Sequence, residues 1–204
     1  MRIILFSNNK HKAQEIRNIL GLNVYIFSDF VESFDVIENE NSFKGNAILK
    51  VKELQKRLTK DILKDSILLS EDSGICIEKL DNKPGIYSKR YANMNDLNAK
   101  NASDMDNIKK VLKELKDKNL ESSNAYFVSC VAAIKDKQIL STHGFLYGRV
   151  IDKIKGNGGF GYDPIFVPNG YTKTLSELID ENHNIKDSIS HRFNALNLMK
   201  ILIK

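Results

Sequence analysis

This 204-residue sequence contains no apolar run near the ~20 residues that a membrane-spanning helix requires. Its first residues form a short strand-like run, without the cleavage site of a signal peptide. We therefore expect a cytoplasmic protein with no membrane partner. Cysteine is also scarce. Cys76 and Cys130 each lie in an apolar, strand-like context, which predicts buried, reduced thiols and argues against a disulfide or a zinc site.

Two common nucleotide-binding signatures are missing as well. The sequence has no G-x-x-x-x-G-K-[ST] and no G-x-G-x-x-G that directly follows a strand, so it lacks the P-loop and Rossmann signatures. It shows no internal repeat and no low-complexity linker, and we expect one domain over residues 1–204. The net charge of +5 is mild, so it permits an anionic partner without requiring a nucleic acid.

Apolar periodicity predicts an α/β fold in which strands and helices alternate. The last two strands should form a hairpin through a tight turn at Asp136-Lys137. The predicted strands cover residues 2–6, 24–27, 66–71, 75–77, 126–135 and 138–147, and the predicted helices cover 10–20, 43–58, 103–116 and a final segment from about 191 to 202.

Two adjacent carboxylates, Glu71 and Asp72, stand where the strand from Ser66 is predicted to end at a Ser73-Gly74 break. Neighbours in a strand point to opposite faces, so the two carboxylates cannot have the same role. Open α/β sheets usually bind ligands at the carboxyl ends of their strands. One carboxylate there suits a Mg²⁺ ion, or a base that activates water.

Two predicted helices begin with cations, although the helix dipole favours acidic residues at that end. The helix that Ser103 caps follows the ordinary order, with acidic residues first and lysines last. A helix start that combines free N–H groups, the positive dipole end and basic side chains is suited to an anion such as phosphate. The cations in question are Lys10, His11, Lys12, His191 and Arg192.

A glycine-rich segment, residues 156–166, surrounds Phe160 and Tyr162. Its glycines allow the backbone to approach a flat ligand closely, and its rings can stack on a base. Together with the carboxylates and the cationic helix starts, it supplies the parts of a site for Mg²⁺, a polyphosphate and a planar base.

Six segments, in this order along nearly the whole chain, resemble the inosine/xanthosine triphosphate pyrophosphatase family, the Ham1-like hydrolases of non-canonical purine nucleotides. The resemblance implies an elongated mixed twisted sheet flanked by helices, two lobes with a central active-site cleft, and a homodimer. It also implies Mg²⁺-dependent cleavage of ITP, dITP and XTP to the monophosphate and pyrophosphate, which cleans the nucleotide pool. The segments are Ser7–Lys12, Ser42–Lys50, Ser70–Gly74, Pro84–Ser88, Gly159–Pro164 and Ser190–Arg192.

The resemblance also implies roles for single residues. Asp72 would be the base and a metal ligand, with Glu38 as the second ligand and Glu40 as the alternative. Ser7 and Asn8 stand where the family usually has Thr and Gly, and Glu71 replaces a frequent Asp. The implied phosphate-side residues are Ser7, Asn8, Asn9, Lys10, His11, Lys12, Lys50 and Ser73; Phe160, Gly161, Tyr162 and Asp163 would line the base pocket; Lys186, His191 and Arg192 would read the 6-oxo edge and its surroundings.

A hydrogen-bond donor of the protein that faces O6 is matched by hypoxanthine or xanthine, whereas it meets the amino group of adenine, which is also a donor. An unmatched buried donor costs about 1–3 kcal/mol.

Two other interpretations stay open. One is a non-catalytic nucleotide- or RNA-binding module, which the lysine-rich helices suggest. The other is a pyrophosphatase that acts on modified pyrimidine or methylated nucleotides.

Overall fold

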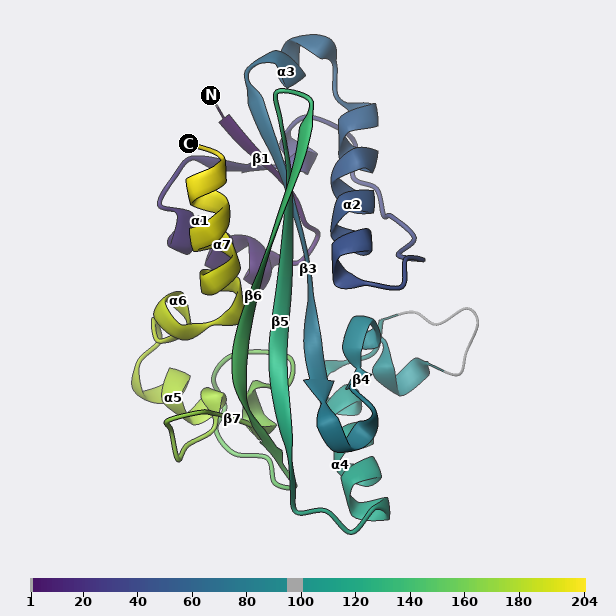
Figure 1. Ribbon diagram of the computed structural model, residues 1–204, viewed down its shortest axis with the longest axis vertical. Helices are drawn as coiled ribbons and strands as arrows, with labels where there is room; N and C mark the ends of the chain where they lie inside the picture. The colour runs from purple at the N-terminus through teal and green to yellow at the C-terminus, as the bar shows by residue number, and fades with distance from the viewer. Residues whose placement is uncertain (1, 95–100) are drawn as a thin grey trace. The chain divides into compact units, whose positions relative to one another are not determined.

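The computed structural model describes residues 2–94 and 101–204. Among these residues, the strands form a seven-stranded mixed sheet of order β2-β1-β3-β5-β6-β7, with β4 beside β3 (Figure 1), and helices flank it as an α/β fold requires. The strands are β1 (Arg2–Phe6), β2 (Val24–Ile26), β3 (Ser66–Ile77), β4 (Lys83–Pro84), β5 (Ser122–Lys135), β6 (Gln138–Ile151) and β7 (Phe166–Pro168).

The chain divides into two compact units, and strands β3, β5 and β6 each contribute residues to both. The division within β3 falls between Asp72 and Ser73. Unit 1 comprises Met1–Asp72, Ser129–Gly144 and His191–Lys204; unit 2 comprises Ser73–Val128 and Phe145–Ser190.

In unit 1, alternate residues of β1 and β3 pack against helices on opposite sides of the sheet. Ile3 of β1 packs in a cluster with α1 (Lys10–Leu20) and α7 (His191–Leu202). Its neighbour Ile4 packs in a second cluster with α2 (Phe43–Arg57). Figure 1 shows α1 and α7 on one side of these strands and α2 on the other. The strand alternation that the sequence predicts therefore separates two different environments.

The helix ends in unit 1 show ordinary capping chemistry. Asn9 caps α1 by accepting from the backbone N–H of Lys12, and Gly21 ends the helix in a left-handed conformation with φ of 59°. Ser42 caps α2. The predicted helices at 10–20 and 43–58 are confirmed. A short helix, α3 (Lys60–Lys64), follows α2 and was not predicted.

Helix α7 lies directly on strand β6 at Gly144. A Cβ atom added to Gly144 would lie 2.2 Å from both the backbone N of Ala195 and the backbone O of His191. The hydroxyl of Thr142 donates to the backbone O of Ala195 at 2.8 Å. Helix and strand therefore meet at a separation that only glycine allows.

The predicted strand end at Ser73-Gly74 is wrong, because β3 continues through these residues without a break. Its parallel partner β1 ends at Phe6, opposite Ser70. Beyond that point β3 pairs with β4, where Cys76 lies opposite Pro84, so the strand has a partner after the parallel pairing stops. The two carboxylates consequently lie within the strand, just past the carboxyl end of β1.

The predicted hairpin of β5 and β6 is confirmed, and both strands are longer than predicted. Asp136 and Lys137 form its turn with φ of 49° and 66°, the left-handed geometry of tight hairpin turns. Cys76 and Cys130 are buried free thiols, as predicted. In the described part of the chain, no helix has the length and apolar character needed to cross a membrane.

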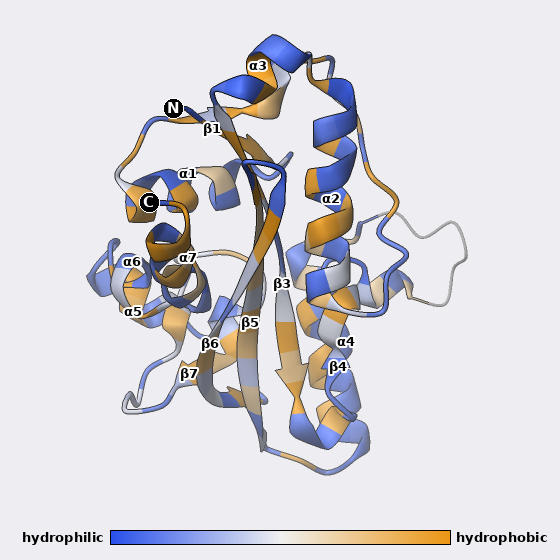
Figure 2. Ribbon diagram, turned by 45° about the horizontal axis from the view of Figure 1, so that its top comes forward, coloured by the Kyte–Doolittle hydropathy of each residue, from blue (hydrophilic) through white to orange (hydrophobic). Residues whose placement is uncertain are grey.

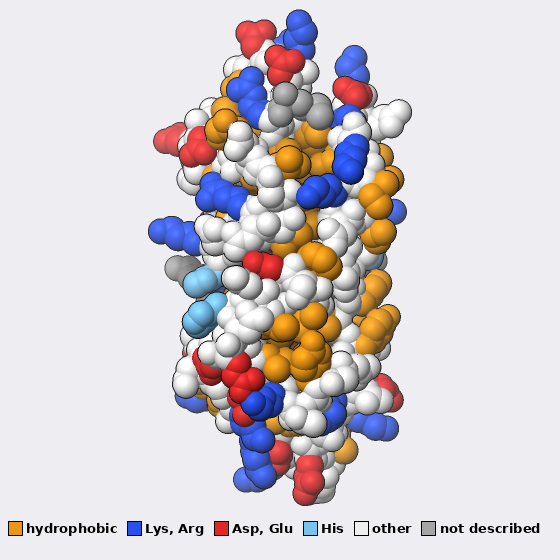
Figure 3. Space-filling model, turned by 90° about the vertical axis from the view of Figure 1, so that its left-hand side faces the viewer, with side chains coloured by type: hydrophobic (Ala, Val, Ile, Leu, Met, Phe, Trp, Pro, Cys, Tyr) orange, Lys and Arg blue, Asp and Glu red, His pale blue; other side chains and the backbone are white. Residues whose placement is uncertain are grey.

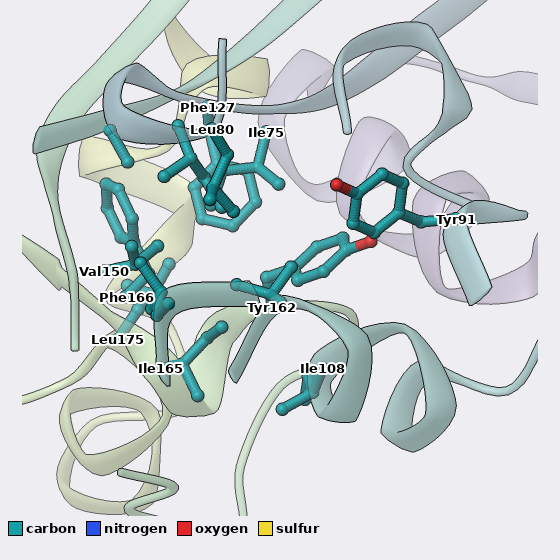
Figure 4. Packing of buried hydrophobic residues seen from close by; sticks show 14 of the residues in the cluster. Ile75, Leu80, Tyr91, Ile108, Phe127, Val150, Tyr162, Ile165, Phe166 and Leu175 are labelled. Carbon is teal, nitrogen blue, oxygen red and sulfur yellow. The ribbon is translucent and has the colours of Figure 1, made fainter. Parts of the chain in front are cut away.

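Unit 2 has its own core, part of which Figure 4 shows. Helix α4 (Asp104–Asp117) begins after its predicted cap, Ser103. In Figure 2, α2 and α4 each have a hydrophobic side and a hydrophilic side, as helices packed on a core should. The remaining elements are α5 (Leu175–Glu181), α6 (Lys186–Ile189) and the 3-10 turns Phe27–Asp29, Glu78–Leu80, Gly85–Tyr87, Tyr91–Asn93 and Asp163–Ile165.

Candidate functional site

Asp72 lies on the α2 side of β3 and is buried. The ammonium group of Lys50 donates to Asp72 Oδ1 at 3.0 Å and to Glu38 Oε1 at 3.1 Å. Asn46, one helical turn before Lys50 on α2, donates to Asp72 Oδ2 at 3.2 Å. Asn46 also accepts from the backbone N–H of Glu40 at 3.1 Å, which ties the irregular segment before α2 to this cluster.

Burial sets the protonation chemistry of this cluster. It raises the pKa of Asp72, an effect that the nearby Glu38 carboxylate reinforces and the Lys50 ammonium opposes. Burial lowers the pKa of Lys50, but the carboxylates of Asp72 and Glu38 outweigh burial and leave that pKa raised. Lys50 therefore keeps its charge at neutral pH, whereas Asp72 is a stronger base than an ordinary aspartate.

Glu71 lies on the opposite face of β3, as the strand alternation predicts. Its carboxylate pairs with Lys12 of α1 at 2.9 Å and with Arg192 of α7 at 3.0 Å. The hydroxyl of Ser129 donates to it at 2.8 Å, and Arg192 also donates to Glu15 at 2.6 Å. Burial would raise the pKa of Glu71, but the charges of Arg192 and Lys12 outweigh it and hold that pKa well below its usual value.

The turn that precedes α1 is held by its own hydrogen bonds. The backbone N–H of Asn9 donates to the hydroxyl of Ser7 at 3.2 Å. The Asn8 side chain donates to the carboxylate of Asp35 at 2.8 Å and to the backbone O of Phe34 at 3.2 Å. These contacts give the predicted phosphate-side turn a defined conformation.

The two cationic helix starts differ in exposure. Lys10 and His11 are exposed at the start of α1. His191 and Arg192, at the start of α7, are buried, and Arg192 is only 1% exposed. Ser190 precedes α7 in extended backbone, the conformation of a helix cap. The second cationic start is therefore turned toward the protein interior, where two carboxylates face the guanidinium group.

In unit 2, Asp163 organises the glycine-rich segment. Its Oδ2 atom accepts from the backbone N–H of Phe160 at 2.9 Å and from Lys186 Nζ at 3.0 Å. Lys186 Nζ also lies 4.0 Å from the centre of the Phe160 ring, within cation–π range. A Cβ atom added to Gly159, whose φ is 80°, would lie 2.3 Å from Asp163 Oδ2. The loop needs glycine there to bring the carboxylate so close.

Tyr162 belongs to the core of unit 2. It is 4% exposed, and Figure 4 shows its ring among the packed side chains, near Tyr91. Its hydroxyl donates to the backbone O of Ser88 at 2.8 Å, and burial raises its pKa well above the usual value of a tyrosine. Of Phe160 and Tyr162, half-buried Phe160 is therefore the one placed to stack on a base.

The structure brings the predicted residues together in two groups, one in each unit. Asn46, Glu15, Ser129 and Asp104 were not predicted, although each contacts a predicted residue. Helical spacing to Lys50 and Lys12 could have indicated Asn46 and Glu15. Unit 1 holds Ser7, Asn8, Asn9, Lys10, His11, Lys12, Glu38, Lys50, Asp72, His191 and Arg192; unit 2 holds Ser73, Phe160, Gly161, Tyr162, Asp163 and Lys186.

Among the described residues, no group of three or more His, Cys, Asp or Glu side chains is arranged to hold a metal ion. Glu38 and Asp72 nevertheless both lie within hydrogen-bond distance of one cation, the Lys50 ammonium. Two carboxylates suit Mg²⁺, which usually takes one or two from the protein and its remaining ligands from water and substrate phosphates. The residues present therefore fit a metal that binds together with its substrate.

Charges of both signs are mixed on one face of the molecule. On the face shown in Figure 3, Lys and Arg side chains are interspersed with Asp and Glu side chains and with hydrophobic groups. Non-specific nucleic-acid binding depends on clustered positive charge. This face therefore does not favour the alternative of an RNA-binding module.

Comparison with known proteins gives concordant results. Residues 3–201 match the model of the Ham1 family. The chain is 44% identical over 205 residues to a dITP/XTP pyrophosphatase of Nautilia profundicola, covering 100% of this chain and 98% of the relative. It is 41% identical to a dITP/XTP pyrophosphatase of Sulfurimonas denitrificans, covering 100% and 99%. The solved structure of the Staphylococcus aureus Ham1 protein is 33% identical, with a TM-score of 0.80 and coverage of 99% and 97%.

Proposed function

Because the chain belongs to the Ham1 family, we propose that it hydrolyses the non-canonical purine nucleotides ITP, dITP and XTP to the nucleoside monophosphate and pyrophosphate. Relatives that match over their whole length carry the name dITP/XTP pyrophosphatase, which supports this substrate class. The structural observation that carries the proposal is the buried carboxylate of Asp72, which has a raised pKa and contacts a charged lysine. Such a group suits the activation of water.

Asp72 accepts the proton of the attacking water in the proposed mechanism. Asn46 and Lys50 orient its two oxygens, since each donates to a different one. Water attacks the α-phosphorus, and pyrophosphate is the leaving group. Lys50 and Lys12 supply positive charge toward the phosphates, which stabilises the charge that builds up on their oxygens. Asp72 and Glu38 would hold Mg²⁺, which when bound neutralises phosphate charge.

The base-recognising residues belong to the glycine-rich segment and its partners. Phe160 stacks on the purine, and Lys186 donates to its 6-oxo group. Asp163 supports both, because it binds the Phe160 amide and the Lys186 ammonium. His191 and Arg192 complete the proposed set, although in this structure Arg192 donates to Glu15 and Glu71. Ser73 and the residues 7–11 contribute on the phosphate side.

Pyrophosphate release from ITP, XTP, dITP, GTP, ATP and dUTP in the presence of Mg²⁺ tests the proposal. We expect release from the first three, and much slower release from ATP and GTP. Preferred cleavage of dUTP or of a methylated nucleotide would instead support the pyrophosphatase of another modified nucleotide. Salt-sensitive binding of oligonucleotides without any pyrophosphate release would support the binding module.

We also propose that the active form is a cytoplasmic homodimer and that residues 1–204 act as one domain. Sedimentation analysis measures the oligomeric state, and a mass of twice 23.2 kDa is the expected result. A monomer at concentrations where the enzyme is fully active would contradict it.

A further inference from the structure

The two peptide groups on either side of Phe160 are held by two different carboxylates of unit 2. The N–H of Phe160 donates to Asp163 Oδ2 at 2.9 Å, within the same loop. The N–H of Gly161 donates to Asp104 Oδ2 at 2.7 Å, a residue 57 positions earlier in the chain. Because each peptide group is planar, these bonds together restrict the backbone that carries the Phe160 ring.

Asp104 is itself well anchored. It lies in the first turn of α4, where the helix dipole favours a negative charge. Its other oxygen, Oδ1, accepts from Lys89 Nζ at 3.0 Å. The helix also has its own cap in Ser103, which accepts from the N–H of Asp106 at 3.1 Å. The Asp104 carboxylate contacts two residues outside its helix, Lys89 and Gly161.

Gly161 donates its N–H to Asp104 from an unusual backbone conformation. Its φ is 63°, in the left-handed region that residues other than glycine rarely adopt. A charge-assisted hydrogen bond of 2.7 Å compensates for fixing such a flexible residue in one conformation. Without the Asp104 carboxylate, the Phe160–Gly161 peptide group loses its 2.7 Å bond and keeps the longer bond of 3.4 Å that the backbone O of Phe160 accepts from the N–H of Asp163.

From these contacts we propose that Asp104 is a positioning residue for substrate specificity: it holds the Phe160–Gly161 peptide group so that the Phe160 ring presents a fixed face to the purine. This inference rests on the proposed function of Phe160. Asp104 acts through the backbone of Gly161 and takes no part in the chemical steps of the hydrolysis. The pair of Asp163 and Lys186 has its own bond of 3.0 Å and does not depend on Asp104.

The kinetic test is Asp104→Ala, assayed by pyrophosphate release from ITP. Loss of a hydrogen bond to a charged group should raise the KM about tenfold, since it weakens ground-state binding by about 1.4 kcal/mol. The kcat should stay within about twofold of the wild type, because the Asp72 cluster of unit 1 is unchanged. Discrimination between ITP and GTP should fall as the ring loses its fixed orientation.

Three variants separate positioning from helix stability. Asp106→Ala is the matched control, because Asp106 is an acid in the same first turn and accepts from the Ser103 hydroxyl at 2.6 Å. It should leave the KM unchanged. Asp104→Asn keeps an oxygen acceptor for the Gly161 N–H and should recover most of the affinity. Lys89→Met removes only the ion pair, which is largely exposed, and should have little effect.

A spectroscopic readout tests the inference without substrate. The sequence contains no tryptophan, so Phe160→Trp introduces a single fluorescent reporter at the position in question. In that background, Asp104→Ala should raise the acrylamide quenching constant of the tryptophan by about twofold, since the side chain samples more orientations. Asp106→Ala should not.

Equal KM values and equal quenching for Asp104→Ala and Asp106→Ala would overturn the positioning role. If the wild-type protein releases no pyrophosphate from ITP, the proposed function fails instead, and the quenching comparison still decides whether Asp104 holds the loop. If circular dichroism shows that Asp104→Ala is unfolded, Asp104→Asn carries the test. Its neutral acceptor makes a weaker bond than a carboxylate, so its KM and quenching constant should still exceed those of Asp106→Ala, and equal values would overturn the positioning role.

Discussion

Glu71 and Asp72 are neighbours in strand β3, yet the two faces of the strand give them opposite properties. On the α1 and α7 side, two cations and a hydroxyl surround Glu71 and hold its pKa well below the usual value. On the α2 side, burial raises the pKa of Asp72. Adjacent carboxylates whose environments displace their pKa values in opposite directions have different roles.

The largest effect that separates the two faces is expected for Asp72→Asn. Pyrophosphate release from ITP should fall by about 10²–10⁴-fold, the usual contribution of a general base. The free energy of unfolding should change by less than about 1 kcal/mol, because the fold already disfavours the charged form of Asp72. Turnover close to the wild-type rate would rule out the catalytic role. Urea denaturation monitored by circular dichroism measures the stability.

Arg192→Met should reduce the stability of the protein, through the face of β3 that carries Glu71. Removing the guanidinium leaves Glu71 and Glu15 buried without this partner, and breaking a buried ion pair costs about 3–5 kcal/mol. Urea denaturation measures the loss. Lys173→Met is the control, because its pair with Glu181 is exposed and should contribute less than about 1 kcal/mol. Similar losses for the two variants would show that the Glu71 network is not structurally important.

The pH dependence of activity and of stability should also differ. Asp72 must be ionised to act as a base, and its pKa lies above the ordinary value of 3.8, so activity should fall first as the pH decreases. The folded-state pKa of Glu71 is depressed. Its contribution to stability is therefore complete above the unfolded value, ordinarily 4.5, and is lost only as the pH falls toward the folded value.

We accordingly expect an acidic interval in which the protein is folded but inactive, and in which activity returns when the pH is raised. Rate measurements and circular dichroism over the same pH series provide the comparison. Loss of structure at or above the pH at which activity disappears would contradict the assignment of opposite pKa shifts.

The smallest expected effect is that of Ser129→Ala. The Ser129 hydroxyl donates to Glu71 at 2.8 Å, and its removal leaves Lys12 and Arg192 in place. The free energy of unfolding should decrease by about 1–2 kcal/mol, the contribution of a hydrogen bond to a charged group. Turnover should be unaffected. A thermal melt and the pyrophosphate assay test this expectation. A loss of activity without a loss of stability would show that Ser129 contributes to catalysis and not to stability.

Much of the fold could be predicted from local signals in the sequence. Asn9 and Gly21 bracket α1, and Ser42 and Ser103 cap their helices, because a cap depends only on residues within one turn. The hairpin turn at Asp136-Lys137 is equally local. The break predicted at Ser73-Gly74 was wrong because strand continuation depends on pairing with other strands, here β5 on one edge of β3 and β4 at Cys76 and Ile77, which no local pattern in β3 encodes.

The candidate site, like the fold, could be predicted only where it depends on local geometry. Glu71 and Asp72 could be assigned to opposite faces from strand geometry alone. The partners of Arg192 could not, since Glu15 lies 177 positions away and Glu71 lies 121 positions away. From the sequence, two cations at the start of α7 suggest an anion site. In the structure, the chain supplies its own carboxylates to Arg192.

The ion pair between Arg192 and Glu71 also limits which residue can stand at position 144, where the chain has a glycine. Any side chain at this position would push the first turn of α7 away from β6, since a methyl group already overlaps two backbone atoms of the helix. Arg192 starts in that turn, so the displacement would carry its guanidinium away from Glu71. If Gly144 is replaced by every other amino acid, we therefore expect only the glycine clones to be functional, although Gly144 itself takes no part in binding or catalysis.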